Sequence, residues 1–352
     1  MLDNLNLLAQ RDPSGTRLAA AHMTEQVAHQ TVVVAADRAE VREVRQVVLA
    51  GMGGSALAAD MMKVLVAGWL HIPVEVVKGY ELPGYSNQHT LVITLSHSGN
   101  TEETIACYKQ AKARGCMLAA VATGGQLLTL AEQDKLPHVV VPKGGQPRMA
   151  SVYHLKAVMK LLELFMVIDD DLYQRASSDE MQQWLGQELS AWAPEVPTAS
   201  NPAKQLALQL IGKTPIFYGG ELTWPLAYKW KISCNESAKN TAYHNQYPEF
   251  NHNEFMGWTS HPIEKPFAII DIRSSLERPR IRERMELSDR LLSGMRPKAM
   301  VVELQGKTLL HQLLWGLSFA DITAVYMGIL NGVNPEPVAL IERFKKELSP
   351  LD

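Results

Sequence analysis

Three hydroxyl side chains crowd one short segment of the chain. Ser96, Ser98 and Thr101 follow an apolar run at 91–95 that is typical of a strand, and a helical pattern begins near Glu102. Unpaired backbone N–H groups and the positive end of a helix dipole meet at such a turn, so an anion fits there. The hydroxyls add donors for a phosphate dianion. Ser and Thr are also ordinary helix N-caps, so this segment alone leaves capping and phosphate binding both open.

A second strand-to-helix turn is rich in glycine. Apolar residues 47–50 precede the stretch 51–55, which reads Gly-Met-Gly-Gly-Ser. Glycines let the backbone approach an anion closely, and Ser55 can cap the next helix. The pattern G-x-G-x-x-A at residues 51–56 also fits a dinucleotide fingerprint, with Glu75 as the acid that would bind the ribose. A third possibility is a tight strand-to-helix turn that binds no ligand. A dinucleotide site does not need a second hydroxyl-rich loop, whereas a sugar phosphate would sit between two such loops.

A carboxylate and an imidazole lie 16 residues apart in the second half of the chain. Glu236 is near the end of a helical pattern at 222–239, and His252 lies in the polar segment 250–258. Isomerising a sugar phosphate requires a base that moves a proton between adjacent carbons and an acid/base pair that opens the ring, and Glu and His suit these roles. Residue type alone leaves Glu236 open as a solvated helix-end acid paired with Lys239, and His252 as a core or interface histidine.

A metal site is the competing reading of the same region. Four residues that can bind metals are close in sequence: His244, His252, Glu254 and His261. They form neither a helical histidine pair at i and i+4 nor a Cys-x-x-Cys pattern. We therefore expect no metal site.

The elements around these segments alternate between strands and helices. In the first half, strand-like runs recur at 45–50, 73–77, 90–95, 117–121 and 138–141, with helical stretches between the first four. In the second half, a strand at 215–218 ends in Gly219-Gly220, and further strands at 266–272 and 298–304 alternate with helices at 222–239, 277–294 and 307–330. This alternation predicts an α/β protein with two similar domains, each a parallel sheet flanked by helices.

The predicted domains meet where the alternation of strands and helices is interrupted. They are an N-terminal helical segment at 1–40, a first domain at 41–150, connecting helices at 151–200, a second domain at 201–335 and a C-terminal helix at 336–352. The connecting region contains an apolar helix at 152–168 and one polar helix at 173–192. We expect these helices, with Trp184 and Trp192, to offer surface for a partner. Glu221 follows the second Gly-Gly turn and would repel phosphate, so the first domain should hold the anion.

Composition narrows the class of partner. The 352 residues carry a net charge of −3 and only 7% aromatics, which disfavours nucleic acid. Three cysteines without a spacing motif indicate a reducing, cytoplasmic setting, and the first residues show no signal-peptide pattern. The apolar stretch 309–330 contains His311, Gln312 and Asp321, so it is interpreted as a core helix, not a membrane span.

The ordered motifs resemble one family, the bifunctional phosphoglucose/phosphomannose isomerases built from two sugar-isomerase (SIS) domains. The residues that carry the resemblance are 51–55, the run from Ser96 to Thr104, Pro147-Arg148, the Asn-Glu-Ser-Ala-Lys block at 235–239, the His-Asn-Glu block at 252–254, and the pattern from Pro337 to Leu348. The likeness spans residues 40 to 350. His97 stands where a tyrosine is usual, and Lys346 adjoins Lys345, so the resemblance leaves either lysine as the one that enters the site.

The resemblance implies a fold, a reaction and a site. It implies doubly wound, flavodoxin-like domains and interconversion of glucose 6-phosphate or mannose 6-phosphate with fructose 6-phosphate through an enediol, without metal or organic cofactor. The residues implied to bind substrate are Gly54, Ser55, Ser96, Ser98, Thr101 and Arg148, with Arg148 stabilising the enediolate. Glu236 is implied as the base, and His252 and Lys345 as ring-opening residues, His252 from the other subunit of a homodimer. A non-catalytic SIS-type regulator that binds sugar phosphate is the alternative.

Overall fold

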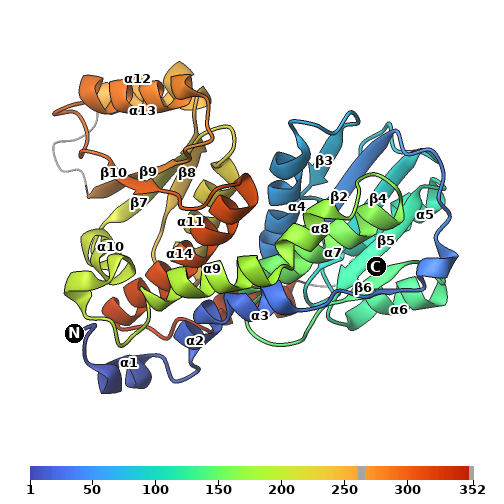
Figure 1. Cartoon of the computed structure of the whole chain (residues 1–352), viewed down its shortest axis with the longest axis horizontal. Helices are drawn as coiled ribbons and strands as arrows, with labels where there is room; N and C mark the ends of the chain where they lie inside the picture. Colours follow the sequence, from blue (N-terminus) through green and yellow to red (C-terminus); the bar gives the residue numbers. More distant parts are fainter. Residues whose placement is uncertain (261–265, 349–352) are drawn as a thin grey trace.

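The computed structural model describes residues 1–260 and 266–348 as two α/β lobes that stand side by side (Figure 1). The first lobe holds a six-stranded sheet in the order β1-β6-β5-β4-β2-β3. Its strands are β1 (Val33–Val34), β2 (Gln46–Gly51), β3 (Val74–Val77), β4 (Thr90–Ser96), β5 (Met117–Ala122) and β6 (His138–Val140). All pairs are parallel except β1 with β6. The five parallel strands have the flavodoxin-like order, as predicted.

Helices cover both faces of this sheet because alternate residues of a strand point to opposite sides. Val47 and Leu49 of β2 pack in one core with α4 (Gly53–Val66) and α7 (Ser151–Leu164). Val48 and Ala50 face the other core, formed with α5 (Glu102–Ala113) and α6 (Gly125–Gln133). The sheet begins before residue 41, since β1 pairs with β6, and α7 packs on α4, so the first lobe extends beyond both predicted boundaries.

The second lobe repeats the plan with a four-stranded parallel sheet in the order β10-β9-β7-β8. Its strands are β7 (Thr214–Gly219), β8 (Tyr243–Gln246), β9 (Phe267–Arg273) and β10 (Met300–Glu303). The helices are α10 (Pro202–Leu210), α11 (Trp224–Glu236), α12 (Glu254–Gly257), α13 (Pro279–Leu291) and α14 (Leu309–Leu330), and the short η4 (Glu249–His252) lies between β8 and α12. The sequence did not predict β8, because this edge strand reads Tyr-His-Asn-Gln and lacks an apolar run.

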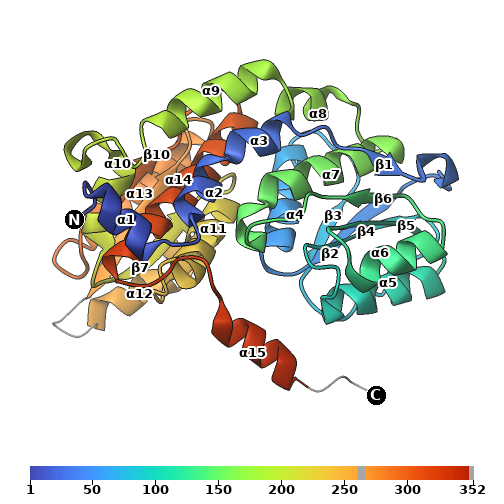
Figure 2. The same cartoon turned by 90° about the horizontal axis from the view of Figure 1, so that it is seen from below.

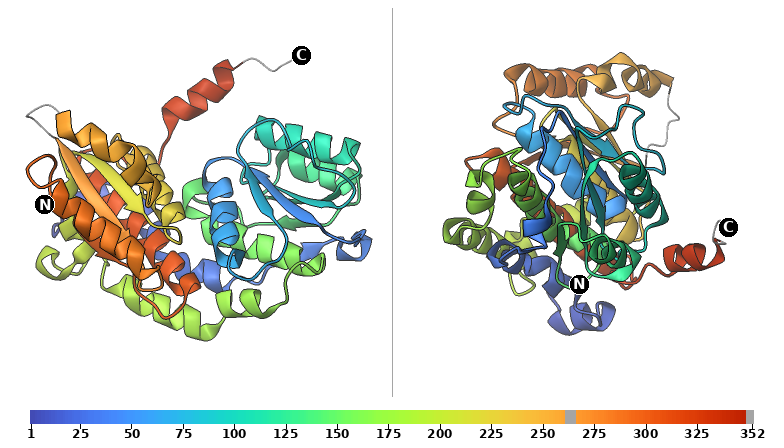
Figure 3. Two further views of the ribbon diagram at one scale, coloured as in Figure 1. Left: turned by 90° about the horizontal axis from the view of Figure 1, so that it is seen from above. Right: turned by 90° about the vertical axis from the view of Figure 1, so that its right-hand side faces the viewer.

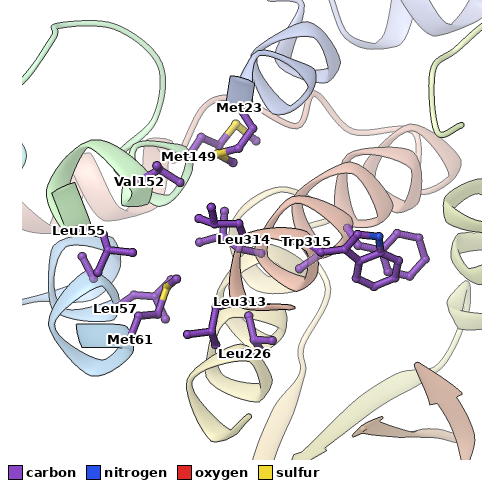
Figure 4. Packing of buried hydrophobic residues seen from close by; sticks show 14 of the residues in the cluster. Met23, Leu57, Met61, Met149, Val152, Leu155, Leu226, Leu313, Leu314 and Trp315 are labelled. Carbon is purple, nitrogen blue, oxygen red and sulfur yellow. The ribbon is translucent and has the colours of Figure 1, made fainter. Parts of the chain in front are cut away.

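Helix α14 is long and apolar enough to cross a membrane by length and composition, yet 94% of its most apolar window is buried inside the structure. It is the central helix of the core that the two lobes share. Figure 4 shows Leu313 and Leu314 of α14 facing Leu57 and Met61 of α4 and Leu226 of α11. The lobes are therefore joined by continuous apolar packing.

The connecting region differs from its prediction. Instead of one helix at 173–192 there are α8 (Asp171–Ala176) and α9 (Asp179–Ser190), because Ser178 caps a new helix by accepting a hydrogen bond from Met181 N. Trp192 is 2% exposed and packs on Trp315 and Phe319, while α7 lies in the core. The expectation that these segments offer partner surface was wrong for Trp192 and α7, since both are already buried within the chain.

The two ends of the chain behave differently. The N-terminal helices α1 (Leu5–Arg11), α2 (Thr16–Ala21) and α3 (Met23–Ala28) pack along the underside of the lobes (Figure 1). Four short 3₁₀ turns complete the described chain besides η4: η1 (Ala36–Arg38), η2 (Pro147–Met149), η3 (Thr198–Ser200) and η5 (Trp258–Ser260). Helix α15 (Ala339–Glu347) has no buried side chain and projects away from both lobes (Figures 2 and 3).

Candidate active site

The two loops predicted to bind an anion meet at the carboxyl ends of adjacent strands. β2 and β4 pair in parallel with Gly51 opposite Leu95, so the loops that follow them start side by side. The main-chain N–H of His97 donates to Ser55 Oγ at 3.1 Å, which ties one loop to the other. In the flavodoxin-like order, β2 and β4 flank the switch point, where α/β sheets bind their ligands.

The hydroxyl groups of the second loop do not cap the helix that follows. Ser96 Oγ and Thr101 Oγ1 lie 2.7 Å apart, and Gly99 N donates to Ser96 Oγ at 3.0 Å. Thr101 is the N-cap residue of α5 but makes no side-chain cap bond, and neither does Met52 before α4. The first N–H groups of α5 and α4 therefore lack a side-chain acceptor from their N-cap residues, which favours an anion site over simple capping. Ser98 is exposed, and its Oγ accepts from Asn100 N at 3.2 Å.

Gly54 connects the loops to the cationic residue of the site. A Cβ at position 54 would lie 2.7 Å from the Pro147 carbonyl oxygen, so only glycine lets the first turn of α4 approach η2 this closely. Arg148 lies on η2, which places it next to the glycine-rich loop. The close backbone contact thus positions an arginine beside the expected phosphate.

Arg148 is buried and fully engaged. Its Nη1 pairs with Glu236 Oε2 at 3.1 Å, and its Nε donates to Ser237 Oγ at 2.9 Å. Its Nη2 donates to the carbonyl oxygens of Pro335 and Glu336 at 2.8 and 3.1 Å. Burial lowers the pKa of the Arg148 guanidinium, and the negative charge of Glu236 opposes that shift. A buried guanidinium held by this many acceptors is a fixed positive charge aimed at a carboxylate.

Glu236 is the last residue of α11 and remains open to solvent on one side. Its side chain is 26% exposed, and its carboxylate pairs with Arg148 rather than with Lys239. Lys239 Nζ donates instead to the main-chain oxygens of Glu236 and Pro335. Burial, with the charge of Arg148 second, lowers the pKa of Lys239 to about 8. The alternative that Glu236 is a solvated acid paired with Lys239 is therefore wrong.

His252 and Lys345 do not join this group within the chain. His252 is exposed and lies on η4, which packs beside α12 of the second lobe. Lys345 lies on the projecting helix α15, where its Nζ is 3.5 Å from Glu342 Oε1 (Figure 2). The structure thus brings the two loops, Arg148 and Glu236 together and leaves the two predicted ring-opening residues outside.

No group of three or more His, Cys, Asp or Glu side chains in the described residues is arranged to hold a metal ion. The ring of His244 packs on Tyr228 at 5.2 Å between centroids, and burial together with nearby Lys231 and Lys78 lowers its pKa to about 4. Glu254 accepts hydrogen bonds from Tyr218 and Asn245. His261 lies outside the described residues.

Comparison with known proteins identifies the family of this chain. Residues 40–167 match the SIS domain, and residues 199–348 match the bacterial phospho-glucose isomerase C-terminal SIS domain. The bifunctional phosphoglucose/phosphomannose isomerase of Caldicellulosiruptor bescii is 33% identical over 317 residues, which cover 89% of this chain and 92% of that protein. This chain belongs to the bifunctional phosphoglucose/phosphomannose isomerase family.

Two more proteins support the membership and the fold. The bifunctional phosphoglucose/phosphomannose isomerase of Aquifex aeolicus is 29% identical and covers 86% of this chain and 90% of its own length. Among solved structures, a glucose-6-phosphate isomerase like protein from Thermus thermophilus matches with a TM-score of 0.63 at 21% identity, over 98% of both chains, and shows the same fold. The alternative of a non-catalytic SIS-type regulator finds no support among these relatives.

The register between β2 and β3 argues against a dinucleotide site at the glycine-rich loop of this SIS isomerase. Glu75 pairs with Val48, three residues before Gly51, and it is exposed in the middle of β3. An acid that binds a ribose must reach the carboxyl edge of the sheet, where the ligand lies. Val77, and not Glu75, stands opposite Ala50 near that edge.

Two residues of the candidate site were not predicted by role. Ser237 is completely buried and accepts the hydrogen bond from Arg148 Nε, and Lys239 secures the main chain near Pro335. Both belong to the 235–239 block, so the motif contained the signal, but their partners lie about 90 residues away in the sequence. Only the folded chain identifies those partners.

Proposed function

We propose that this protein is an aldose–ketose isomerase that interconverts glucose 6-phosphate and mannose 6-phosphate with fructose 6-phosphate. The observation that carries the proposal is the pair of Arg148 and Glu236, a buried fixed cation bonded to a partly exposed carboxylate. The pair lies next to two loops that carry hydroxyl groups, and each loop leads into a helix start without a side-chain cap. The names of the relatives support the choice of substrates.

The proposed reaction divides into anchoring and proton transfer. Ser55, Ser96, Ser98 and Thr101, with the backbone at Gly54, hold the phosphate at the first lobe. The carboxylate of Glu236 removes the proton from C2 of the open-chain aldose and returns it to C1, while the hydroxyl proton moves between O2 and O1. Arg148 stabilises the negative oxygen of the enediolate, because a fixed cation favours charge that develops only in the transition state.

Ring opening requires a second acid/base set, His252 and Lys345, and we assign His252 to a second copy of this chain in a homodimer. His252 and Lys345 are exposed in their own chain, and Lys345 lies on the projecting helix α15 (Figure 2). Helix α15 also leaves Leu340, Phe344 and Leu348 exposed at 81%, 64% and 49%, which supports packing of this helix against another surface. A two-fold dimer would form two composite sites. The three cysteines are free and buried, which supports a cytoplasmic, reducing location.

A coupled assay tests the function directly. Fructose 6-phosphate is supplied in the presence of EDTA, and glucose 6-phosphate and mannose 6-phosphate are measured separately. We expect both products, since the two aldoses differ only in configuration at C2. Tight binding of sugar phosphate with neither product formed would replace the proposal with the regulatory role.

A further inference from the structure

A completely buried ion pair lies behind the site and has no role in the reaction described above. Lys229 Nζ and Asp321 Oδ1 are 2.6 Å apart, and both side chains are 0% exposed. Ser233 Oγ also donates to Asp321 Oδ1 at 2.8 Å. Lys229 and Ser233 lie on α11, and Asp321 lies on α14, so the pair is within the second lobe.

The same lysine reaches across to the first lobe. Lys229 Nζ donates to the main-chain oxygen of Arg148 at 2.6 Å. Glu236, two turns further along α11, bonds the guanidinium of the same arginine. One helix therefore holds both ends of Arg148: its backbone through Lys229 and its side chain through Glu236.

Stability alone is a poor reason for this pair. Desolvating two charges is expensive, and well-packed apolar residues often replace a buried pair without loss of stability. Asp321 Oδ2 is buried and has no hydrogen-bond partner among the described residues, so the carboxylate is only half satisfied. Its negative charge does act on Arg148, however. Burial lowers the pKa of the guanidinium, and the charge of Asp321 opposes this more than any other except that of Glu236.

We propose that Lys229 and Asp321 are positioning residues that fix the main chain of Arg148, so that its guanidinium meets Glu236 and the reacting oxygen in one geometry. This inference rests on the isomerase function proposed above. Neither residue touches the substrate in the proposed mechanism, and both act through Arg148. Displacing a catalytic group by about 1 Å is enough to lower a rate on the order of 10²-fold.

The test replaces the pair by apolar side chains, as Lys229→Met with Asp321→Leu. We expect this variant to retain the wild-type melting temperature within a few degrees, to keep KM within about threefold, and to lose kcat by about 10²-fold. Lys204→Met is the matched control, since Lys204 is equally buried, pairs with Asp3 Oδ1 at 3.1 Å and donates to the carbonyl oxygens of Pro194 and Val196. Its kcat should equal that of the wild type.

A second measurement separates positioning from general damage. In an Arg148→Lys background, adding the Lys229→Met and Asp321→Leu changes should lower kcat by no more than about threefold, because residues that act through one group are not additive. If the loss of kcat from Arg148→Lys and the loss from the paired changes simply multiply, the inference is overturned. If the double variant does not fold, Asp321→Asn takes its place, with an expected loss of about tenfold in kcat, and an unchanged kcat would overturn the inference.

The proposed function and the inference fail in different ways. A wild-type enzyme that forms neither product overturns the function and, with it, this inference. A wild-type enzyme that turns over, beside a folded Lys229→Met and Asp321→Leu variant with the same kcat, overturns the positioning role alone.

Discussion

The first four parallel strands have the same order in both lobes, but the lobes differ at the start of the helix that follows the first of these strands. In the first lobe, the loops after β2 and β4 present Ser55, Ser96 and Thr101, and no N-cap side chain occupies the start of α4 or α5. In the second lobe, the loop after β9 supplies Glu277, whose Oε1 accepts from Leu222 N at 2.7 Å in the turn before α11. The loop after β9 is the counterpart of the loop after β4, since each follows the third strand of its parallel sheet.

The difference shows how one fold can serve two purposes. Gly220 belongs to the second Gly-Gly turn, and a Cβ there would lie 2.3 Å from Glu277 Oε1, so the carboxylate occupies the space beside this turn. Burial raises the pKa of Glu277, and the N–H of Leu222 opposes that rise. The second lobe thus carries its own anion where the first lobe is open to one. The opposite end of α11 then supplies Glu236 to the first lobe.

If the second lobe contributes the base, replacing Glu236 should cause the largest loss of kcat. Glu236→Gln keeps the shape and removes the basicity, so kcat should fall on the order of 10²- to 10⁴-fold while KM stays similar. Steady-state kinetics on fructose 6-phosphate measures both. Glu221→Gln, an exposed acid in the turn before the same helix, should retain wild-type kcat. Near-normal kcat in Glu236→Gln would show that another residue, such as Glu254, is the base.

The phosphate assignment to the first lobe predicts the next effect. Ser96→Ala combined with Thr101→Val removes two hydroxyls, and each charge-assisted hydrogen bond is worth about 1.5–3 kcal/mol. KM should therefore rise by about 10²-fold or more. Ser190→Ala, an exposed serine at the end of α9, is the control and should not change KM. An unchanged KM in the double variant would contradict phosphate binding at these loops.

Mixing two inactive variants tests whether the second copy completes the site. Glu236→Gln and His252→Ala should each be nearly inactive, and refolding them together should restore about a quarter of wild-type activity. About half of the dimers are then mixed, and each has one site with both residues intact, in the His252→Ala subunit. If mixed dimers form and no activity returns, His252 acts within its own chain.

The smallest effect concerns the built-in anion of the second lobe. Glu277→Ala leaves Leu222 N without its acceptor and should lower the free energy of unfolding by about 1–2 kcal/mol, as for the loss of a helix cap. Urea denaturation measures this change. KM for the sugar phosphate should stay within about twofold, because the phosphate is held by the other lobe. A rise in KM as large as for the Ser96 and Thr101 variant would mean that both lobes bind the substrate phosphate.

The sequence by itself determined the parallel sheets, and its motifs indicated the candidate site residues. Apolar runs marked the buried strands, because strands covered on both faces read as continuous hydrophobic segments. The motif at 235–239 and the hydroxyl loop at 96–101 indicated the family. Two elements were mispredicted from local patterns. The polar edge strand β8 lacks the apolar run that marks a strand, and Ser178 caps a new helix where one continuous helix was predicted.

Only the tertiary structure decided which residues meet. Arg148 and Glu236 are 88 positions apart, and their contact depends on α11 and η2 packing across the two lobes. Glu277 reaches the turn before α11 for the same reason, since the carboxyl ends of neighbouring parallel strands lie at one edge. The exposure of His252 and Lys345 is likewise a property of the folded chain. Local sequence specifies strand, turn and helix, whereas long-range packing specifies the partner of each polar side chain.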